Sequence, residues 1–442
     1  MADFGHVLAL LGWWAVETRL TGGVNQSRQT SVPDDLESRL RPFTADEFDA
    51  AFACLSEGFG EDITEVEGDR MVFEPERTLG LWDGDRVVAT SGIYSRDITI
   101  PGAVVPLAAV TLVSVSPTHR RQGVLAAMMA RQLSEVHERG IEPIAALYAS
   151  EGSIYGRFGY GLASYQGQLK GDTQSMRLRP EVDAGNGRVY PVDEKDFRSA
   201  AIPFYDEIRP QTPGLLSRKD RWWDSLLLDP EKQRNGRSAR RYLLHAEPDG
   251  TVTGFALYRR KADWADAGPD GTVIVIELHA THTAARAALW RYLLSMDLVR
   301  HLSAPLAGRD DPLRHMLTDA RAVGMSQGDA LYVRLVDVGA ALAARRYPTT
   351  IDLILDIEDQ FCPWNAGRWQ LTGGPSYGRC VRTEGDPDLA MTAETLGAVY
   401  LGDTSLGTLA AAGRVREITP GAVAAATTAL GWPVATYSPE GF

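Results

Sequence analysis

The chain has 442 residues, which is enough for two to four domains with large cores. Its 58 acidic residues outnumber its 45 basic ones, and the net charge of −13 disfavours binding to nucleic acid phosphates. No run of about 18 apolar residues is present, so we expect no membrane-spanning segment and no membrane partner. The acidic balance favours a polycationic ligand, although solubility alone also explains it.

Residues 1–37 are expected to form a loosely attached N-terminal extension. Its apolar segment, residues 7–16, lacks a basic start and a small-residue cleavage site, so no signal peptide is predicted. The three cysteines, Cys54, Cys362 and Cys380, form no Cys-x-x-Cys pair, which favours a reducing compartment and no zinc cluster. We therefore expect a cytoplasmic protein, with secretion left open.

A hairpin is predicted at residues 78–96, where two β-rich runs flank Asp83-Gly84-Asp85. The next β-rich run, residues 110–116, leads into Pro-Thr-His-Arg120-Arg121-Gln-Gly and then into a helix. Such a turn offers free backbone amides at a positive helix end, and the two arginines add donors suited to phosphate. The sequence thus predicts a pyrophosphate cradle, with a solvated turn as the alternative.

The surrounding elements support the phosphate interpretation. Residues 124–140 have apolar side chains at helical spacing and end at Gly140, and a buried strand follows at residues 144–148. Neither a G-x-G-x-x-G fingerprint nor a P-loop is present. The order strand, cradle, helix, strand is similar to the cofactor half of acetyl-CoA-dependent N-acetyltransferases of the GNAT superfamily.

A similar pattern returns at residues 241–298, with a second hairpin around Pro248-Asp249-Gly250, a further strand and a helix from about residue 284. This copy has Thr281-His-Thr-Ala-Ala-Arg286 in place of the cradle, without a glycine. Since the backbone cannot then come as close to a pyrophosphate, we expect a structural role for this copy. Glu277, His279 and His282 suggest a metal site, but no supporting ligand motif accompanies them, so coincidence is favoured.

The last third of the chain changes character. Residues 351–357 alternate as a half-buried strand, and short helices are expected at residues 393–401 and 405–413. No catalytic constellation is apparent in this part. The chain ends in the tail Tyr437-Ser-Pro-Glu-Gly-Phe442.

From about residue 38 onward, the chain resembles the Eis (enhanced intracellular survival) family of acetyltransferases. The resemblance lies in residues 113–123, in the long motif at residues 146–161, and in residues 400–413. It implies an α+β architecture: an active GNAT domain at residues 38–180, a degenerate GNAT domain at 181–326, and a sterol-carrier-protein-like α/β domain at 327–442. In each GNAT domain, helices are expected to flank a mixed central sheet. The family assembles as a hexamer, so a homohexamer is expected.

The resemblance implies acetyl transfer from acetyl-CoA to amines of aminoglycoside antibiotics, at several positions, without a metal. Tyr155 matches the general acid of the family, and the terminal carboxylate of Phe442 matches its general base. The implied cofactor-binding residues are Val113, Ser114, Val115, Arg120, Arg121, Gln122, Gly123, Val124, Leu125, Ala126, Ser150 and Glu151. The family often has an acidic residue directly before the terminal Phe, whereas this chain has Gly441 there and Glu440 one position earlier.

These roles agree with the chemistry. Attack on a thioester requires loss of the amine proton, and the leaving thiolate takes up a proton. From the residues alone, Tyr155 is also consistent with an aromatic core position beside Phe158 and Tyr160, and Glu61 and Asp62 fit either an acidic amine pocket or a solvated loop. Protein lysines or polyamines are alternative acceptors. A lipid- or sterol-binding protein with vestigial GNAT domains is the alternative of another class.

Overall fold

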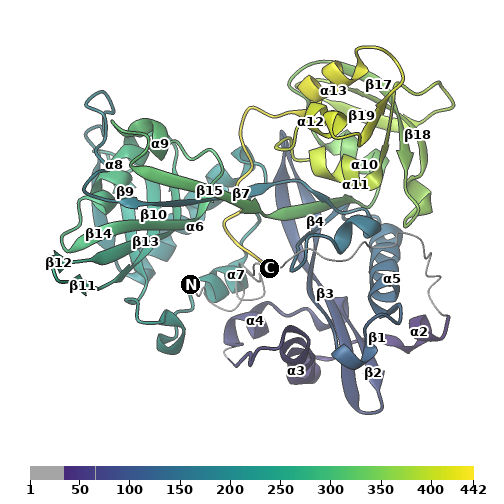
Figure 1. The fold of residues 1–442 in the computed structure, drawn as a ribbon, viewed down its shortest axis with the longest axis horizontal. Coiled ribbons are helices and arrows are strands. Elements are labelled where there is room, and N and C mark those ends of the chain that lie inside the picture. The colour runs from purple at the N-terminus through teal and green to yellow at the C-terminus, as the bar shows by residue number, and fades with distance from the viewer. Residues whose placement is uncertain (1–33, 65) are drawn as a thin grey trace.

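The computed structural model describes residues 34–64 and 66–442, which form three sheet-based units (Figure 1). The expected extension, residues 1–37, lies outside the described residues except for its last four, which begin helix α2 (Asp34–Arg39). Two units are built on seven-stranded sheets and the third on a five-stranded sheet. The predicted α+β architecture, with three sheet-based domains flanked by helices, is confirmed.

The first sheet has the order β1-β2-β3-β4-β5-β16-β6. Helices α3 and α5 contact its central strands β3 and β4. The predicted hairpin is β2 and β3, turning at Gly84 with φ of 60°, and the predicted helix at residues 124–140 is α5. The elements of this unit are β1 (Leu40–Pro42), α3 (Phe48–Phe59), α4 (Glu67–Val72), β2 (Thr78–Asp83), β3 (Arg86–Ile100), β4 (Ala103–Val115), α5 (Val124–Arg139), β5 (Ile144–Tyr148) and β6 (Gly161–Leu162).

The second sheet has the order β15-β7-β14-β13-β10-β9-β8. Its hairpin β9–β10 turns at Gly250, and helix α8 follows β13, which confirms the predicted internal repeat. The elements are β8 (Arg188–Val192), α6 (Glu194–Ile208), α7 (Asp220–Leu227), β9 (Arg241–Ala246), β10 (Val252–Lys261), β11 (Trp264–Ala265), β12 (Gly268–Pro269), β13 (Gly271–Ala280), α8 (Thr283–Leu294), β14 (Val299–Gly308), α9 (Leu313–Met316) and β15 (Val323–Asp329).

The two sheets exchange strands. β7 (Tyr165–Asp172) follows β6 in the chain but pairs with β14 and β15 of the second sheet. β16 (Leu331–Leu335) follows β15 but returns to the first sheet, between β5 and β6. The two sheets therefore do not follow the expected domain boundaries at residues 180/181 and 326/327. The second sheet takes β7 from the expected first domain, and the first sheet takes β16 from the expected third domain.

The third unit packs helices on the sheet β19-β18-β17-β20-β21. Its strand β17 spans the predicted residues and buries Ile351, Leu355 and Ile357 on one face. The elements are α10 (Val338–Ala344), β17 (Ile351–Glu358), β18 (Gly367–Gly373), β19 (Gly378–Arg382), β20 (Leu389–Thr392), α11 (Ala393–Val399), α12 (Leu406–Ala411), β21 (Val415–Glu417) and α13 (Ala422–Leu430).

After α13 the chain leaves the third unit and runs back as an extended tail to the junction of the first two units (Figure 1). The Tyr437 amide donates to the Pro213 carbonyl at 2.9 Å, and residues 438–442 are all buried. Residues 214–217 in turn bond to β3, so this segment lies between the tail and the first sheet. The end of the described chain is thus packed against the first unit.

Candidate active site

Strands β4 and β5 separate at the centre of the first sheet. They pair in parallel only from Leu107↔Ile144 to Ala109↔Ala146. Beyond Ala109, residues 110–111 and 114–115 of β4 remain paired with β3 on one side, and residues 110–115 have no β5 partner on the other. The divergence leaves backbone groups of β4 facing a gap, which is a place for an extended amide-containing arm to add hydrogen bonds.

A β-bulge shapes this part of β4. The register with β3 shifts between Thr90↔Ser114 and Gly92↔Thr111, and Leu112 has φ of 52°, which side-chain-bearing residues seldom adopt. The Thr90 hydroxyl donates to the Leu112 carbonyl at 2.5 Å and so supports the strained residue. Such strain concentrates at functional sites. The bulge redirects the strand immediately before Val113, Ser114 and Val115, the residues expected to meet the pantetheine arm.

The predicted cradle connects β4 to α5. Gly123 is the N-cap residue of α5, with φ of 83°, and it has no side chain that would cap the helix. Arg121 also has a positive φ, of 62°, a conformation that side-chain-bearing residues seldom adopt. Within the described residues, no hydrogen bond is formed by the backbone amides of residues 121–126. These amides and the α5 dipole make the loop suited to an anion, and the residues present therefore fit a pyrophosphate group.

The two arginines of the cradle differ in their surroundings. The guanidinium of Arg120 donates to the carbonyls of Gly58 at 2.6 Å and Val115 at 3.1 Å, so it braces the loop against the end of α3. Arg121 is exposed and has no partner among the described residues. Gln122 donates to the Thr118 carbonyl at 3.0 Å. Arg121 is therefore the charged side chain of this loop that is available to a ligand.

A small pocket lies where β4 and β5 diverge. It is lined by α3 residues Leu55 and Phe59, by residues 110–113 and 147–148, and by Ser150, Tyr155 and Phe442. The residues predicted as general acid and general base, 287 positions apart in the sequence numbering (442 − 155), thus border the same space.

Tyr155 begins a short 3₁₀ turn, residues 155–158, after β5. Its ring packs edge-on near Phe158 and Tyr160, and its side chain is buried. Burial raises the pKa of Tyr155 to about 12, with nearby Arg157 opposing the rise. The phenol therefore carries its proton at neutral pH, as a proton donor must. The sequence left a core role and a catalytic role for Tyr155 as alternatives. In the structure, Tyr155 both packs in the aromatic core and lines the pocket.

The terminal residue closes the pocket. The ring of Phe442 packs against Tyr148, with the ring centroids 5.3 Å apart. The Tyr148 hydroxyl contacts the Ser438 hydroxyl at 2.7 Å and donates to the Glu440 carbonyl at 2.8 Å. The end of the chain is therefore ordered against β5, although chain ends normally fray in solvent.

Other expected site residues lie farther from the pocket centre. Ser150 lines the pocket at its exposed rim, and Glu151 is exposed beside it. Glu61 and Asp62 are both exposed in the loop after α3, as expected for the solvated-loop alternative. Gly441 is buried, and Glu440 does not line the pocket but forms ion pairs with Arg96 and Arg218.

The equivalent helix end in the second unit is already occupied. Nδ1 of the His282 ring accepts a hydrogen bond from the Ala285 amide at 3.3 Å and so caps α8. Nε2 of the same ring lies 3.1 Å from a carboxylate oxygen of Glu247. A cap and a nearby negative charge both oppose binding of a phosphate, in addition to the missing glycine.

Glu277 and His279 are neighbours, with Nε2 of His279 2.5 Å from Glu277 Oε1, but His282 bonds elsewhere. No group of three or more His, Cys, Asp or Glu side chains is arranged to hold a metal in the described part of the chain. The same part contains no helix that combines the length and apolar character needed to cross a bilayer.

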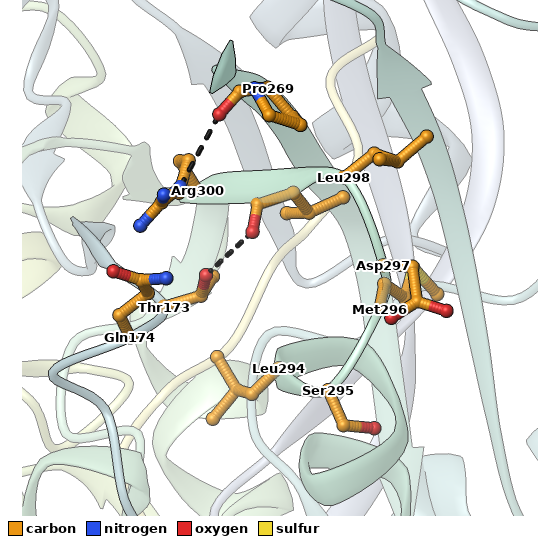
Figure 2. A pocket seen from close by; sticks show the side chains of 10 residues that line it. Thr173, Gln174, Pro269, Leu294, Ser295, Met296, Asp297, Leu298 and Arg300 are labelled. Carbon is orange, nitrogen blue, oxygen red and sulfur yellow. Dashed lines mark hydrogen bonds between the residues drawn. The ribbon is translucent and has the colours of Figure 1, made fainter. Parts of the chain in front are cut away.

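A second pocket lies in the second unit, at the connection from α8 to β14 (Figure 2). Two of its polar side chains are bonded to backbone: the Thr173 hydroxyl donates to the Val299 carbonyl at 3.0 Å, and Nε of Arg300 donates to the Pro269 carbonyl at 3.3 Å. The pocket is at the C-terminal end of α8, away from the helix end that would attract phosphate. It offers no arrangement for acyl transfer.

Comparison with known proteins gives the same class of protein as the divergence of β4 and β5 and the loop before α5. Acetyltransferase (GNAT) domains match residues 39–163 and 214–335, and a sterol carrier protein domain matches residues 338–439. The chain is therefore an acetyltransferase with tandem GNAT domains, a fold that implies an acyl-CoA as donor.

The relatives narrow this class. An uncharacterized N-acetyltransferase of Streptomyces avermitilis is 43% identical over 413 residues, 91% of this chain and 99% of that protein. N-acetyltransferase Eis of Mycobacterium tuberculosis is 36% identical over 345 residues, 76% of this chain and 81% of Eis. The crystal structure of Eis1 from Mycobacterium abscessus superposes with a TM-score of 0.79 at 30% identity, covering 91% of this chain and all of Eis1. The chain belongs to the Eis family of N-acetyltransferases.

Sequence reasoning missed several residues of this region. Tyr148 lies in the long motif, but the motif by itself suggests no role for it, and nothing local connects Arg96, Arg218 and Glu440. For Glu277, His279 and His282 the sequence favoured coincidence over a metal site, but it did not reveal the arginine partner of Glu277: Nη2 of Arg218 lies 2.9 Å from Glu277 Oε1. A carboxylate buried in a strand, such as Glu277, requires a cationic partner. The position of Glu277 within an apolar strand was the sequence signal that could have indicated such a partner.

Proposed function

We propose that the protein is an acetyl-CoA-dependent N-acetyltransferase that acetylates amino groups of aminoglycosides, at more than one position. The observation that carries the proposal is that Tyr155 and the chain terminus at Phe442 line one pocket where β4 and β5 diverge. The donor supplies an activated acetyl thioester. Its pyrophosphate would be held by the α5 amides and Arg121, and its pantetheine arm would follow residues 113–115.

In this proposal the terminal carboxylate of Phe442 accepts a proton from the acceptor amine as nitrogen attacks the acetyl carbonyl carbon. The new C–N bond replaces the C–S bond. The Tyr155 hydroxyl gives its proton to the leaving sulfur, and proton exchange with solvent restores both groups. The raised pKa of Tyr155, about 12, keeps the phenol protonated at neutral pH, so it carries the proton that the leaving sulfur requires.

A polycationic acceptor is supported by charge. The chain carries a net charge of −13, which raises the local concentration of an aminoglycoside by electrostatic steering. The family resemblance favours aminoglycosides, and protein lysines or polyamines are the second candidate because they use the same cofactor site. We also propose that the protein works as a cytoplasmic homohexamer, which size-exclusion chromatography with light scattering tests.

The deciding experiment follows thiol release from acetyl-CoA with three acceptors: a kanamycin-type aminoglycoside, spermidine and a lysine peptide. We expect the aminoglycoside to give the highest kcat/KM and a product mass increased by more than one acetyl group. Preference for the peptide or spermidine would replace the aminoglycoside assignment. Release with none of the three would contradict the proposed acceptor class.

A further inference from the structure

We infer that a buried cluster of four charged residues, Arg96, Arg218, Glu277 and Glu440, positions the terminal carboxylate of Phe442. The inference rests on the proposed role of that carboxylate as the base. It makes Arg218 and Glu277 positioning residues, and it gives the second GNAT unit a part in the reaction of the first.

The cluster is a continuous chain of ion pairs. Arg96 Nη2 lies 2.7 Å from Glu440 Oε1, and Arg218 Nε lies 3.0 Å from Glu440 Oε2. Nη2 of Arg218 continues the chain to Glu277 Oε1 at 2.9 Å. Both carboxylate oxygens of Glu440 are therefore bonded to different arginines, which fixes the orientation of the carboxylate as well as its position.

Each member comes from a different part of the fold. Arg96 is in β3 of the first sheet, and Arg218 lies two residues before the start of α7. Glu277 is in β13 of the second sheet, and Glu440 is in the tail. The cluster therefore joins the tail to both GNAT units at one point.

All four side chains are nearly excluded from water, with exposures of 1% for Arg96, 0% for Arg218, 3% for Glu277 and 9% for Glu440. Two positive and two negative charges balance. Burial and the neighbouring guanidinium act in opposite directions on Glu277, and the net effect lowers its pKa to about 2, so it is ionised. Loss of any one member leaves an uncompensated buried charge, which makes the arrangement all-or-none.

Aromatic rings and a histidine surround the cluster. The guanidinium carbon of Arg96 lies 3.7 Å from the Trp222 ring centroid, and that of Arg218 lies 4.1 Å from the Tyr205 ring centroid. His279 contacts Glu277 on one side and the ring of Tyr437 in the tail on the other, with centroids 5.6 Å apart. These contacts limit movement of the charged groups and of the tail together.

The cluster is close enough to the terminus to control it. Glu440 is two residues before Phe442, a span of at most about 7 Å of extended chain. Tyr148 holds the backbone of Glu440 and the ring of Phe442 from the other side. With Glu440 fixed at both ends, the terminal carboxylate has little freedom, and a catalytic base displaced by about 1 Å loses much of its effect.

The test uses the full-length charge-balanced variant Arg218→Met/Glu277→Gln, which removes the link to the second sheet and leaves the Arg96–Glu440 pair. The matched control is Arg198→Met/Glu194→Gln, which removes a partly exposed ion pair on α6 of the same unit together with the link from Arg198 to Asp224. Two readouts are compared: release of Phe442 by carboxypeptidase A, which reports docking of the tail without activity, and the separate values of kcat and of KM for acetyl-CoA.

We expect the cluster variant to release Phe442 at least tenfold faster than the parent and to lose at least tenfold in kcat, with an unchanged KM for acetyl-CoA. The control should match the parent in both. Unchanged release and unchanged kcat in a folded cluster variant would overturn the inference. If that variant does not fold, Glu440→Gln and the conservative Arg218→Lys replace it, and parent-like release and kcat in both would overturn the inference equally.

A further variant separates this inference from the proposed function. Full activity after deletion of Phe442 would reject the terminal carboxylate as the base. Faster release of Phe442 from the cluster variant would then still establish that the cluster holds the tail. The role of the cluster in positioning a catalytic base would be rejected.

Discussion

The ring of Phe442, the last residue, packs edge-on against the ring of Tyr148, with centroids 5.3 Å apart and the ring planes at 71°. The Tyr148 hydroxyl also donates to the carbonyl of Glu440 at 2.8 Å. Burial raises the pKa of Tyr148, so the phenol stays protonated and keeps this donor role at neutral pH. A tyrosine at the end of β5 thereby places the end of the chain beside Tyr155.

Replacing Tyr155 with Phe removes the proposed proton donor and keeps the ring that packs beside Phe158 and Tyr160. We expect kcat to fall about 100-fold or more while KM for acetyl-CoA stays similar, because the lost interaction acts in the transition state. Steady-state kinetics measures both. Tyr160→Phe is the control, since its buried hydroxyl has no partner among the described residues. Equal activity of the two variants would show that Tyr155 contributes packing and is not the proton donor.

Deleting Phe442, or adding several residues after it, should abolish acetylation while acetyl-CoA binding is retained. The deletion removes the carboxylate from its position, and an extension converts it to a neutral amide. Calorimetry for acetyl-CoA and thermal melting check binding and folding. A C-terminally tagged protein that acetylates at the native rate would contradict the assignment, and Glu61, Asp62 and Glu151 would then be examined as bases.

Arg121→Glu should weaken acetyl-CoA binding by about 2 kcal/mol or more, because a repulsive charge replaces a charge-assisted hydrogen bond to phosphate. Arg139→Glu at the other end of α5 is the matched charge reversal, and its side chain is likewise exposed. Calorimetry should show the loss for the first variant alone. Equal affinity in both variants would remove Arg121 from the cofactor site.

Titration should give one acetyl-CoA per chain. The second unit lacks the glycine turn, and His282 and Glu247 occupy the helix end where a pyrophosphate would lie. Isothermal calorimetry with a protein concentration from absorbance gives the ratio. A value of two would show that these side chains move aside.

Stability should depend on pH through Asp69, a buried carboxyl in α4. Burial raises its pKa from 3.8 to about 7. The folded state therefore holds this proton more tightly than the unfolded chain, so the contribution of Asp69 to stability is fully present below about pH 4, is lost as pH rises, and levels off above about pH 7. The total loss is about 2 to 4 kcal/mol.

The variant Asp69→Asn removes this dependence. Its melting temperature should change less between about pH 5 and pH 8 than that of the parent. Asp62→Asn, at an exposed position in the preceding loop, is the control and should behave as the parent. Parallel pH profiles for all three proteins would contradict the assignment of the titration to Asp69.

The sequence predicted those features that depend on neighbouring residues. The turn at Gly84, the helix from Val124 and the alternation of β17 follow from local chemistry, and the structure confirms each of them. The exchange of β7 and β16 was not predictable, because a strand's pattern shows which face is buried but not which sheet it joins. Leu112 illustrates the same limit, since its positive φ arises from the register of two strands and not from its own preference.

The site residues likewise include a group that could be predicted from neighbouring residues and a group that could not. The cradle residues 120–123 form one contiguous run, so their proximity follows directly from the sequence. Arg96, Arg218 and Glu440 come together across 344 positions of sequence numbering, and only the folded chain brings them into contact. The family resemblance supplied the one long-range pairing that could be predicted, between Tyr155 and the terminus.

The exchanged strands also determine the order in which the protein can be completed on the ribosome. β5 ends at Tyr148, but its neighbour β16 begins only at Leu331, and β6 pairs only with β16 in that sheet. A nascent chain therefore emerges with an unpaired β5 edge until the whole second sheet has been synthesised. An exposed edge of this kind is prone to pair with other chains. Translation that stops between these strands is expected to yield aggregating fragments rather than a smaller working enzyme.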